Sequence, residues 1–324
     1  MRILVTGGAG FIGSHVSEQL LRHHHSVSIV DDLNDFYSPQ EKHNNLTMIR
    51  QAGPVSFYQA DICDAEAVGR IFREVRPEVV IHLAARAGVR PSLERPLLYE
   101  KVNVNGTLVL LEASREAGTG KFLFASSSSV YGIANHVPFN EDDHVNRPIS
   151  PYAATKLAGE HLCYTFSHLY GMPVVCLRFF TVYGPRQRPD LAIHKFTTMI
   201  ECGNAIPVFG DGTSGRDYTF VDDIVQGVLA ALAYHCKFEV FNLGNSHPVD
   251  LKTVIATIER LLGKTAVLQT LPVQPGDVPI TYADISKARA LLGYDPATSF
   301  PDGVEHFIEW VRSRHQVPGI LANE

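Results

Sequence analysis

The stretch Arg2-Ile3-Leu4-Val5-Thr6-Gly7-Gly8-Ala9-Gly10-Phe11-Ile12-Gly13 decides the fold of this chain. Its first five residues are mostly apolar and predict a buried strand, and an apolar helical pattern follows the glycines to about residue 21. Gly8, Gly10 and Gly13 form a G-x-G-x-x-G pattern. Glycines at such a turn allow a tight bend, close approach of the backbone to a pyrophosphate, and close packing of the helix on the strand. The stretch therefore predicts a strand, a phosphate-binding turn and a helix.

A pair of acids indicates the kind of nucleotide. A second strand pattern, at residues 26–30, ends at Asp31 and Asp32. An acid about 20 residues after the glycine pattern binds the ribose hydroxyls of an adenosine, and no arginine follows directly to bind a 2′-phosphate. NAD is therefore favoured over NADP, with a flavin or a purely structural turn as the alternatives. The residues predicted to bind the cofactor here are Gly7, Gly10, Phe11, Ile12, Gly13, Asp31 and Asp32.

Strand and helix patterns continue to alternate along the chain. Strands are predicted at residues 55–58, 79–83, 121–125, 174–180 and 238–242, and helices at 64–75, 96–117, 150–170, 221–233, 248–262, 285–292 and 303–314. The alternation predicts an α/β fold with a Rossmann-type doubly wound parallel sheet and ligand sites at the carboxyl ends of its strands. We expect residues 1–180, with a returning segment at about 216–243, to form this NAD-binding Rossmann domain. Residues 181–324 then form a smaller C-terminal α/β domain that binds the substrate.

A tyrosine and a lysine four residues apart suggest the chemistry. In Ser150-Pro151-Tyr152-Ala153-Ala154-Thr155-Lys156, Tyr152 and Lys156 lie on one helical face, and Ser150 and Pro151 suit the start of a helix. A phenol normally has a pKa of about 10, too high for a base in neutral water. The Lys156 ammonium and an oxidised nicotinamide would both lower the pKa of Tyr152. The pair therefore suits a base that takes a proton from a sugar hydroxyl as hydride leaves the carbon, and an ordinary amphipathic helix is the alternative.

Composition narrows the class of protein. The 324 residues are 45% hydrophobic and carry a net charge of −6, which gives no reason to expect a nucleic-acid or membrane partner. The five cysteines are scattered and include no C-x-x-C pattern, as in proteins with reduced thiols. No apolar run approaches the ~20 residues of a membrane span, and no signal peptide precedes the first strand pattern. We expect a cytoplasmic protein without a metal site.

Motifs along nearly the whole chain resemble the extended short-chain dehydrogenase/reductase superfamily, and within it the nucleotide-sugar epimerases. They are residues 6–13, His82-Leu83-Ala84-Ala85, Asn103-Val104-Asn105-Gly106-Thr107, residues 126–132, residues 152–156, residues 177–188 and Gly215-Arg216-Asp217-Tyr218. The resemblance implies that Tyr152 is the base, that Lys156 holds the nicotinamide ribose and that Ser127 shares the substrate hydroxyl. It also implies further cofactor-binding residues, namely Asp61, Ile62, Leu83, Ala84 and Ala85, and a homodimer formed through helices 97–117 and 150–170.

The segment after the fifth strand distinguishes between reactions of this superfamily. The resemblance implies that 4,6-dehydratases carry S-T-D-E-V-Y-G and decarboxylases S-T-S-E-V-Y-G, whereas residues 126–132 here read S-S-S-S-V-Y-G. Without a carboxylate at these positions, the chain lacks the acid and the base that elimination of water requires. Oxidation, rotation of the ketone and return of hydride to the other face remain. The expected reaction is epimerisation at C4 of a UDP-sugar with recycled NAD.

The sugar is indicated by departures from one pattern and by resemblance to another. UDP-glucose 4-epimerases usually carry Asn where this chain has Thr181, and Arg where it has Gln274, whereas residues 33–37, 87–90 and 180–190 resemble UDP-glucuronate 4-epimerases. A C6 carboxylate needs hydroxyl donors or a guanidinium. The residues predicted to bind substrate are Arg86, Ser128, Ser129, Thr181, Arg186, Arg188, Arg216 and Asp277.

Alternatives remain at this stage. Arg186 or Arg188 could bind the diphosphate or the uridine instead of a carboxylate. UDP-glucose 4-epimerase is the nearest alternative to UDP-glucuronate 4-epimerase, followed by UDP-glucuronate decarboxylase and by a non-catalytic NAD-binding sensor.

Overall fold

The computed structural model describes residues 1–133, 136–272 and 278–315. Its main layer is a seven-stranded sheet in the order β10-β6-β5-β4-β1-β2-β3, and all its strand pairs are parallel. The strands are β1 (Arg2–Thr6), β2 (Ser26–Asp31), β3 (Val55–Gln59), β4 (Val79–His82), β5 (Lys121–Ser127), β6 (Val174–Phe179) and β10 (Phe238–Leu243). The order reverses between β1 and β4, which is the doubly wound arrangement predicted from the sequence.

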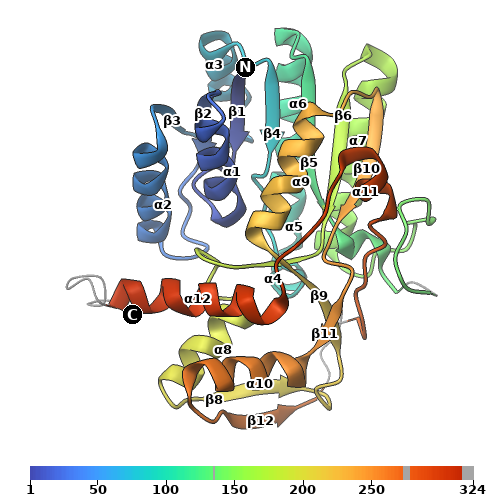
Figure 1. The fold of residues 1–324 in the computed structure, drawn as a ribbon. Helices are drawn as coiled ribbons and strands as arrows, with labels where there is room; N and C mark the ends of the chain where they lie inside the picture. The colour runs from blue at the N-terminus through green and yellow to red at the C-terminus, as the bar shows by residue number, and fades with distance from the viewer. Residues whose placement is uncertain (134–135, 273–277, 316–324) are drawn as a thin grey trace.

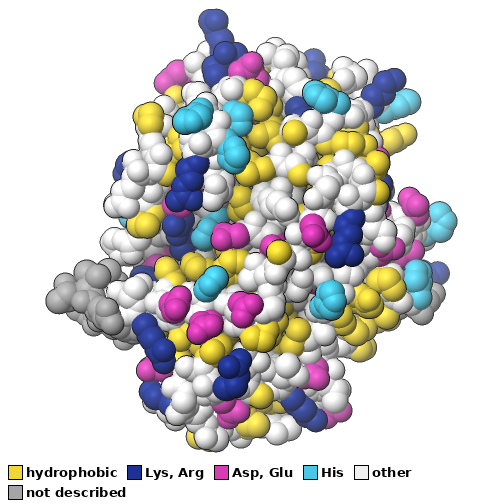
Figure 2. Space-filling view, in the orientation of Figure 1, with side chains coloured by type: hydrophobic (Ala, Val, Ile, Leu, Met, Phe, Trp, Pro, Cys, Tyr) yellow, Lys and Arg dark blue, Asp and Glu magenta, His cyan; other side chains and the backbone are white. Residues whose placement is uncertain are grey.

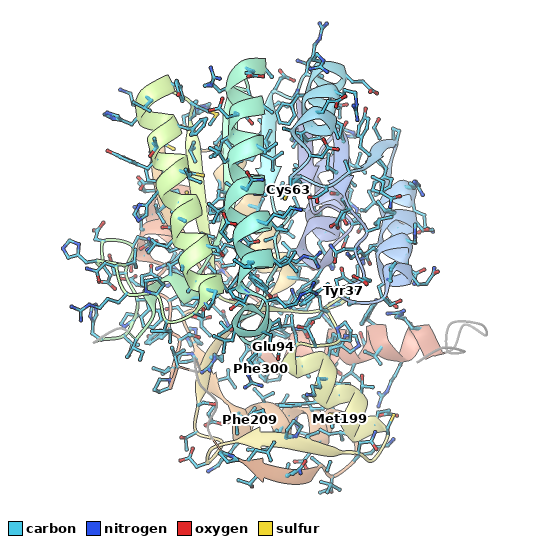
Figure 3. The ribbon with its side chains drawn as sticks, turned by 180° about the vertical axis from the view of Figure 1, so that it is seen from behind. Tyr37, Cys63, Glu94, Met199, Phe209 and Phe300 are labelled. Carbon is cyan, nitrogen blue, oxygen red and sulfur yellow. The ribbon has the colours of Figure 1, made fainter. Side chains whose placement is uncertain are left out.

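Helices cover both faces of this sheet (Figures 1 and 3). One face carries α1 (Phe11–Arg22), α2 (Pro39–Ala52), α9 (Val221–Ala233) and α11 (Ser286–Leu292). The opposite face carries α3 (Ala65–Val75), α6 (Gly106–Ala117) and α7 (Pro151–Tyr170). Two apolar clusters result, one on each side of the sheet, because strands buried on both faces present apolar side chains in both directions.

A smaller region lies below the carboxyl ends of the strands in Figure 1. It contains the three-stranded sheet β11-β9-β7 and the two-stranded sheet β12-β8. Its strands are β7 (Thr181–Tyr183), β8 (Ala205–Phe209), β9 (Gly215–Phe220), β11 (Pro248–Asp250) and β12 (Val267–Leu271), and its helices are α8 (Ala192–Glu201), α10 (Leu251–Leu262) and α12 (Phe300–His315). On the face in Figure 2, basic and acidic side chains are interspersed, and acidic ones gather over α12.

Several predicted elements differ from the observed ones. Helix α2 was not predicted, because its sequence is mostly polar and only four of its residues are buried. The helix expected at 248–262 begins at Leu251, where the Asp250 carboxylate accepts a hydrogen bond from the backbone N–H of Thr253 at 2.6 Å.

The helix expected at residues 96–117 is divided into three parts. A π-helical turn (Lys101–Asn105) joins α5 (Pro96–Glu100) to α6, and α4 (Val89–Glu94) precedes them. Asn103 in the π turn is buried; its amide nitrogen donates to the Arg86 carbonyl at 2.9 Å and to the Thr155 hydroxyl at 3.0 Å. The π turn thus connects the segment after β4 to the first turns of α7.

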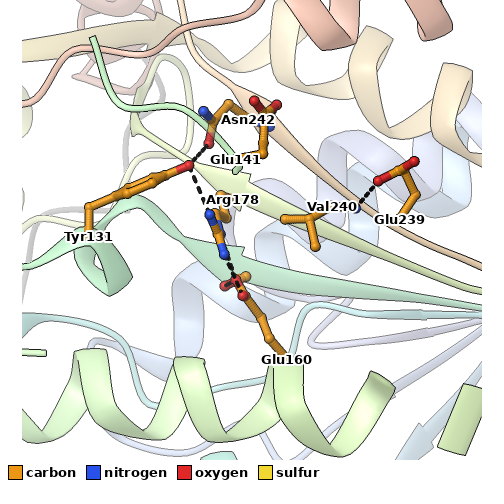
Figure 4. Close-up of polar contacts among 8 residues, drawn as sticks. Tyr131, Glu141, Glu160, Arg178, Glu239, Val240 and Asn242 are labelled. Atoms are coloured by element: carbon orange, nitrogen blue, oxygen red, sulfur yellow. Dashed lines mark hydrogen bonds and ion pairs between the residues drawn. The ribbon is translucent and has the colours of Figure 1, made fainter. Parts of the chain in front are cut away.

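A buried ion pair joins α7 to the sheet (Figure 4). The Arg178 guanidinium of β6 donates two hydrogen bonds to the Glu160 carboxylate, at 2.9 and 2.8 Å. Glu160 also accepts a hydrogen bond from Ser126 at 2.5 Å, and Arg178 donates to the Tyr131 hydroxyl at 2.9 Å. Tyr131 in turn donates to the side chain of Asn242 on β10 at 2.8 Å. One polar network therefore connects β5, β6, β10 and α7.

A second buried polar chain passes through His82 at the end of β4. Its two ring nitrogens lie 2.7 Å from the Thr6 hydroxyl and 2.9 Å from the Thr107 hydroxyl. The Thr107 hydroxyl donates its proton to the Asn103 carbonyl, so it must accept the hydrogen bond from Nε2–H of His82. Nδ1 of His82 then accepts from the Thr6 hydroxyl. Burial, together with the charge of Lys156, lowers the pKa of His82 from 6.5 to about 3. The imidazole is therefore neutral in the folded protein at neutral pH.

We predict that Glu160→Gln lowers the free energy of unfolding by about 3–5 kcal/mol, because it leaves the Arg178 guanidinium buried without a counter-charge. Chemical denaturation followed by circular dichroism measures this change. The control is Glu112→Gln, which breaks an exposed pair with Arg115 and should lower the free energy of unfolding far less. Equal losses in the two variants would contradict the prediction.

We also predict that His82→Gln flattens the dependence of stability on pH between 6.5 and 3. In this interval the unfolded chain binds a proton at His82 that the folded protein does not, so stability falls as pH falls. Removing the imidazole should reduce the slope by up to about 1.4 kcal/mol per pH unit. Denaturation at several pH values measures the slope. His43→Gln, on the exposed surface of α2, should leave the slope unchanged.

Candidate active site

A cavity of about 470 Å³ lies at the carboxyl ends of the main-sheet strands. Segments that follow β1, β2, β3, β4 and β5 line it, together with the start of α7 and residues from β7 onward. Tyr37, which Figure 3 labels at the lower end of the strands, belongs to this lining. The cavity is therefore at the switch point of the sheet, where doubly wound folds bind their ligands.

The glycine turn leaves no room for side chains. Gly7 has φ +69°, and a Cβ atom there would lie 2.7 Å from the backbone nitrogen of Ala84. A Cβ atom on Gly13 would lie 2.1 Å from the carbonyl oxygen of Gly7. Residues 10–13 line the cavity, and no side chain caps this end of α1. Its first-turn N–H groups and the positive end of the helix dipole suit a diphosphate.

Two acids stand at the end of β2. Asp31 accepts hydrogen bonds from the backbone N–H groups of Ala9 at 3.1 Å and Leu33 at 3.0 Å. Burial raises the pKa of Asp31, and these hydrogen bonds oppose the shift. Both Asp31 and Asp32 line the cavity, next to the glycine turn that is proposed to bind phosphates. Carboxylates in this place suit the hydroxyls of a ribose.

Tyr152 lies in the first turn of α7, whose start matches the sequence prediction. Ser150 caps the helix by accepting from the backbone N–H of Ala153 at 3.1 Å, and Pro151 is its first residue. Tyr152 is partly buried and lines the cavity, and burial by the surrounding protein raises its pKa. The hydrogen bond with Ser127 and the positive charge of Arg188 both lower that pKa, so they oppose the effect of burial.

Lys156 is buried one turn after Tyr152. Its ammonium donates to the carbonyl oxygen of Ala125, at the end of β5, at 2.7 Å. Burial lowers the pKa of Lys156 to about 8, and the Glu160 carboxylate is among the groups that oppose the shift. Arg188 therefore adds a positive charge near Tyr152 that the sequence reasoning, which considered Lys156 and the nicotinamide, did not include.

The four serines at residues 126–129 form one wall of the cavity. Ser127 accepts hydrogen bonds from the backbone N–H of Ser129 at 3.2 Å and from its hydroxyl at 3.0 Å. Ser128 and Ser129 offer hydroxyls where dehydratases resembling this chain are expected to have acids. This wall can donate and accept hydrogen bonds, but it carries no carboxylate.

The predicted arginines occupy different places. Arg188 lines the cavity, lies over the Phe36 ring at 5.0 Å and donates two hydrogen bonds to Asp190, at 2.9 and 2.8 Å. Arg86 and Arg216 also line the cavity. Arg186 does not: its guanidinium pairs with Glu18 of α1 at 2.7 Å, on the far side of the loop.

The structure thus brings most of the predicted site residues into one cavity. They are Gly7, Gly10, Phe11, Ile12, Gly13, Asp31, Asp32, Asp61, Ile62, Leu83, Ala84, Ala85, Arg86, Ser127, Ser128, Ser129, Tyr152, Lys156, Thr181, Arg188 and Arg216. Arg186 lies elsewhere because its loop turns it toward α1, and Asp277 lies outside the described residues.

Some cavity residues were not found by sequence reasoning. They include Tyr37, Lys42, Phe139, Ile149, Val278 and Thr281. Of these six residues, only Tyr37 lies in a segment, residues 33–37, whose sequence resembles UDP-glucuronate 4-epimerases. Lys42 lies on α2, which was not predicted, and Ile149 directly precedes the Ser150 cap of α7. Phe139, Val278 and Thr281 reach the cavity from distant parts of the chain and leave no local spacing signal.

Two further features of the described residues bear on other classes of function. Among the described residues, no group of three or more His, Cys, Asp or Glu side chains could hold a metal ion. None of the described helices is long and apolar enough to cross a bilayer.

Known proteins resemble this chain over nearly its whole length. The family model for GDP-mannose 4,6-dehydratase matches residues 4–307. A UDP-glucuronate 4-epimerase of Thermodesulfobacterium geofontis is 44% identical over 308 residues, which cover 95% of both chains.

Solved structures give the same result. A Bacillus cereus UDP-glucuronic acid 4-epimerase, crystallised with UDP-glucuronic acid and NAD, is 37% identical, with a TM-score of 0.91 over 97% of this chain and 100% of that chain. A Thermus thermophilus UDP-glucose 4-epimerase, crystallised with NAD, is 35% identical, with a TM-score of 0.87 over 96% of this chain and 99% of that chain. The resemblance inferred from the motifs is confirmed, and the chain belongs to the nucleotide-sugar short-chain dehydrogenase/reductase family that the GDP-mannose 4,6-dehydratase model describes.

Proposed function

We propose that this protein is an NAD-dependent UDP-sugar 4-epimerase that converts UDP-glucuronate to UDP-galacturonate through a 4-keto intermediate. The observation that carries the proposal is the meeting of Ser127, Tyr152 and Lys156 with the glycine turn in one cavity. The similarity to UDP-glucuronate 4-epimerases, one of them solved with NAD and UDP-glucuronic acid, supports both cofactor and substrate.

The residues present fit NAD. The narrow glycine turn and uncapped start of α1 would hold the pyrophosphate, Asp31 and Asp32 the adenosine ribose, and Lys156 the nicotinamide ribose. Asp61 and Ile62 would contact the adenine end, and residues 83–85, which line the cavity, would contact the dinucleotide. When bound, NAD supplies the hydride acceptor and donor, and its oxidised ring adds a positive charge near Tyr152.

The protein's own residues move the proton. Ser127 and Tyr152 hold the C4 hydroxyl, and Tyr152 accepts its proton as the C4–H bond breaks. Burial keeps the pKa of Tyr152 high, so the positive charges around it are needed to make the phenolate accessible. After the ketone rotates, Tyr152 returns the proton when C4 regains hydrogen on its other face. Oxidation and reduction balance, and the sugar leaves with one inverted centre.

The serine wall supports epimerisation rather than elimination. The dehydration named by the family model needs an acid and a base beside C5 and C6. At the corresponding place this chain has Ser128 and Ser129, whose hydroxyls cannot take that part. They can donate hydrogen bonds to a C6 carboxylate, as can Thr181, and Arg188 can supply a charge-assisted pair. Arg216 would contact the diphosphate from β9, within residues 181–324 that we assign to substrate binding.

An epimerase acting on glucuronate has an additional constraint. The 4-keto intermediate is a β-keto acid. It loses carbon dioxide when its C5–C6 bond is parallel to the π orbitals of the C4 carbonyl. A site with several groups that donate hydrogen bonds to the carboxylate can keep the C5–C6 bond out of this alignment.

UDP-glucose 4-epimerase is the second candidate, favoured by the similarity to the Thermus thermophilus enzyme.

The assembly we propose is a cytoplasmic homodimer. The helices of the α5–α7 face expose several large apolar side chains, which a second copy could cover: Leu97 is 82% exposed, Leu169 62% and Tyr164 53%. All five cysteines are free, as in a reducing compartment.

We predict that Tyr152→Phe reduces kcat with UDP-glucuronate by roughly 10²–10⁴-fold, because it removes the group that carries the proton. Bound NAD, measured by absorbance after denaturation, should remain. The control is Tyr164→Phe, the same change at an exposed position of the same helix, which should leave kcat unchanged. Unchanged turnover in Tyr152→Phe would remove Tyr152 as the base.

We predict that the purified protein turns over UDP-glucuronate with a kcat/KM about 10–100-fold above that for UDP-glucose, as the loss of a charge-assisted hydrogen bond implies. Nuclear magnetic resonance and mass spectrometry of the products measure this. A preference for UDP-glucose would support the second candidate. UDP-xylose and carbon dioxide would indicate a decarboxylase, and no turnover with NAD bound would indicate a sensor.

A further inference from the structure

Two arginines of one loop extend in opposite directions. Arg188 lines the cavity, whereas the side chain of Arg186, two residues earlier, pairs with Glu18 on α1, the helix that follows the glycine turn. Arg186 Nη1 lies 2.7 Å from Glu18 Oε1, and only 11% and 9% of the two side chains are exposed. Neither atom has a hydrogen-bond partner outside this pair, and both atoms are buried.

A second contact reinforces this pair. His15, one helical turn before Glu18, lies with Nε2 3.0 Å from the carbonyl oxygen of Pro185. Burial and the charge of Arg186 lower the pKa of His15 to about 3, so the ring is neutral and donates this hydrogen bond. Helix α1 therefore holds two consecutive residues of the loop, Pro185 and Arg186.

The loop backbone depends on these contacts. Arg186 has φ +66°, a left-handed conformation that side-chain-bearing residues adopt only where their surroundings fix it. On its other side the loop is held by Gln187, which is buried and donates to the Val182 carbonyl at 3.2 Å. The left-handed turn between these anchors is what sends Arg186 to α1 and leaves Arg188 over the Phe36 ring in the cavity.

We propose that Glu18 and Arg186 are positioning residues that hold the Arg188 guanidinium where it restrains the C6 carboxylate of the substrate. The inference rests on the proposed function and adds residues of the cofactor helix to its specificity. Neither Glu18 nor Arg186 touches the sugar; both act through the loop that carries Arg188.

The consequence is a choice between two fates of the intermediate. When the carboxylate is restrained, the 4-keto sugar receives hydride and leaves as the epimer. When it is released, the C5–C6 bond breaks, carbon dioxide leaves, and its electron pair forms an enolate with the C4 ketone that takes a proton at C5. The resulting keto-pentose departs without receiving hydride, so one NAD remains as NADH for each carbon dioxide lost.

The test compares Glu18→Gln and Arg186→Gly with wild type, each as the NAD-loaded enzyme. Glycine suits the left-handed position, so Arg186→Gly removes the side chain without straining the backbone. We expect the dissociation constant for UDP-glucuronate, measured by calorimetry, to rise about tenfold and that for UDP-glucose to change much less. We also expect a larger fraction of turnover to end as carbon dioxide and NADH.

The matched control is Arg22→Gln. Arg22 lies 3.9 Å from Glu18 on the same helix, but its side chain is 58% exposed, so this change should alter neither readout. Unchanged affinity ratio and product fraction in Glu18→Gln and Arg186→Gly would overturn the inference, as would a loss of activity toward both sugars alike with a lowered melting temperature, which indicates a structural role only. If wild type itself makes no product from UDP-glucuronate, the proposed function fails instead, and the inference fails with it.

Discussion

The buried ion pair between Glu160 and Arg178 is the interaction on which the site depends most directly. Two charges taken out of water are stable only when each is fully matched, and here a serine and a tyrosine complete the matching. The cost of leaving any member unpaired fixes the relative positions of β5, β6 and α7. Ser127 directly follows Ser126, and Lys156 lies one helical turn before Glu160 in α7. Glu160 and Arg178, which do not line the cavity, therefore help to fix the positions of Ser127 and Lys156.

The electrostatics of the protein alone oppose the chemistry it is proposed to perform. Burial raises the pKa of Tyr152 and lowers that of Lys156 to about 8, so burial disfavours the charged form of both groups. An efficient base needs a pKa nearer to the working pH. Arg188 supplies one compensating charge, and a bound oxidised nicotinamide would supply another. A bound cofactor would therefore make it easier for Tyr152 to accept a proton.

Much of the fold could be predicted because its signals are local. The glycine pattern after an apolar strand, the alternation that followed and the Ser150–Pro151 helix start each depend on a few neighbouring residues. Helix α2 was missed because its polar sequence has little periodicity. The separate places of Arg186 and Arg188 could not be read from sequence, because they follow from a left-handed residue and from a partner on α1. Phe139 and Thr281 join the cavity only through the tertiary fold.

The π-helical turn at residues 101–105 has a consequence for the length of this part of the chain. An α-helix advances by about 100° per residue, so deleting one residue to restore regular winding would swing α4 and α5 by roughly that angle against α6. The amide of Asn103 would leave Arg86 and Thr155, and the exposed side chain of Leu97 would face a new direction. The extra residue therefore ties the geometry of the catalytic pocket to that of the outer surface, and natural variants should conserve the number of residues here more strictly than their identity.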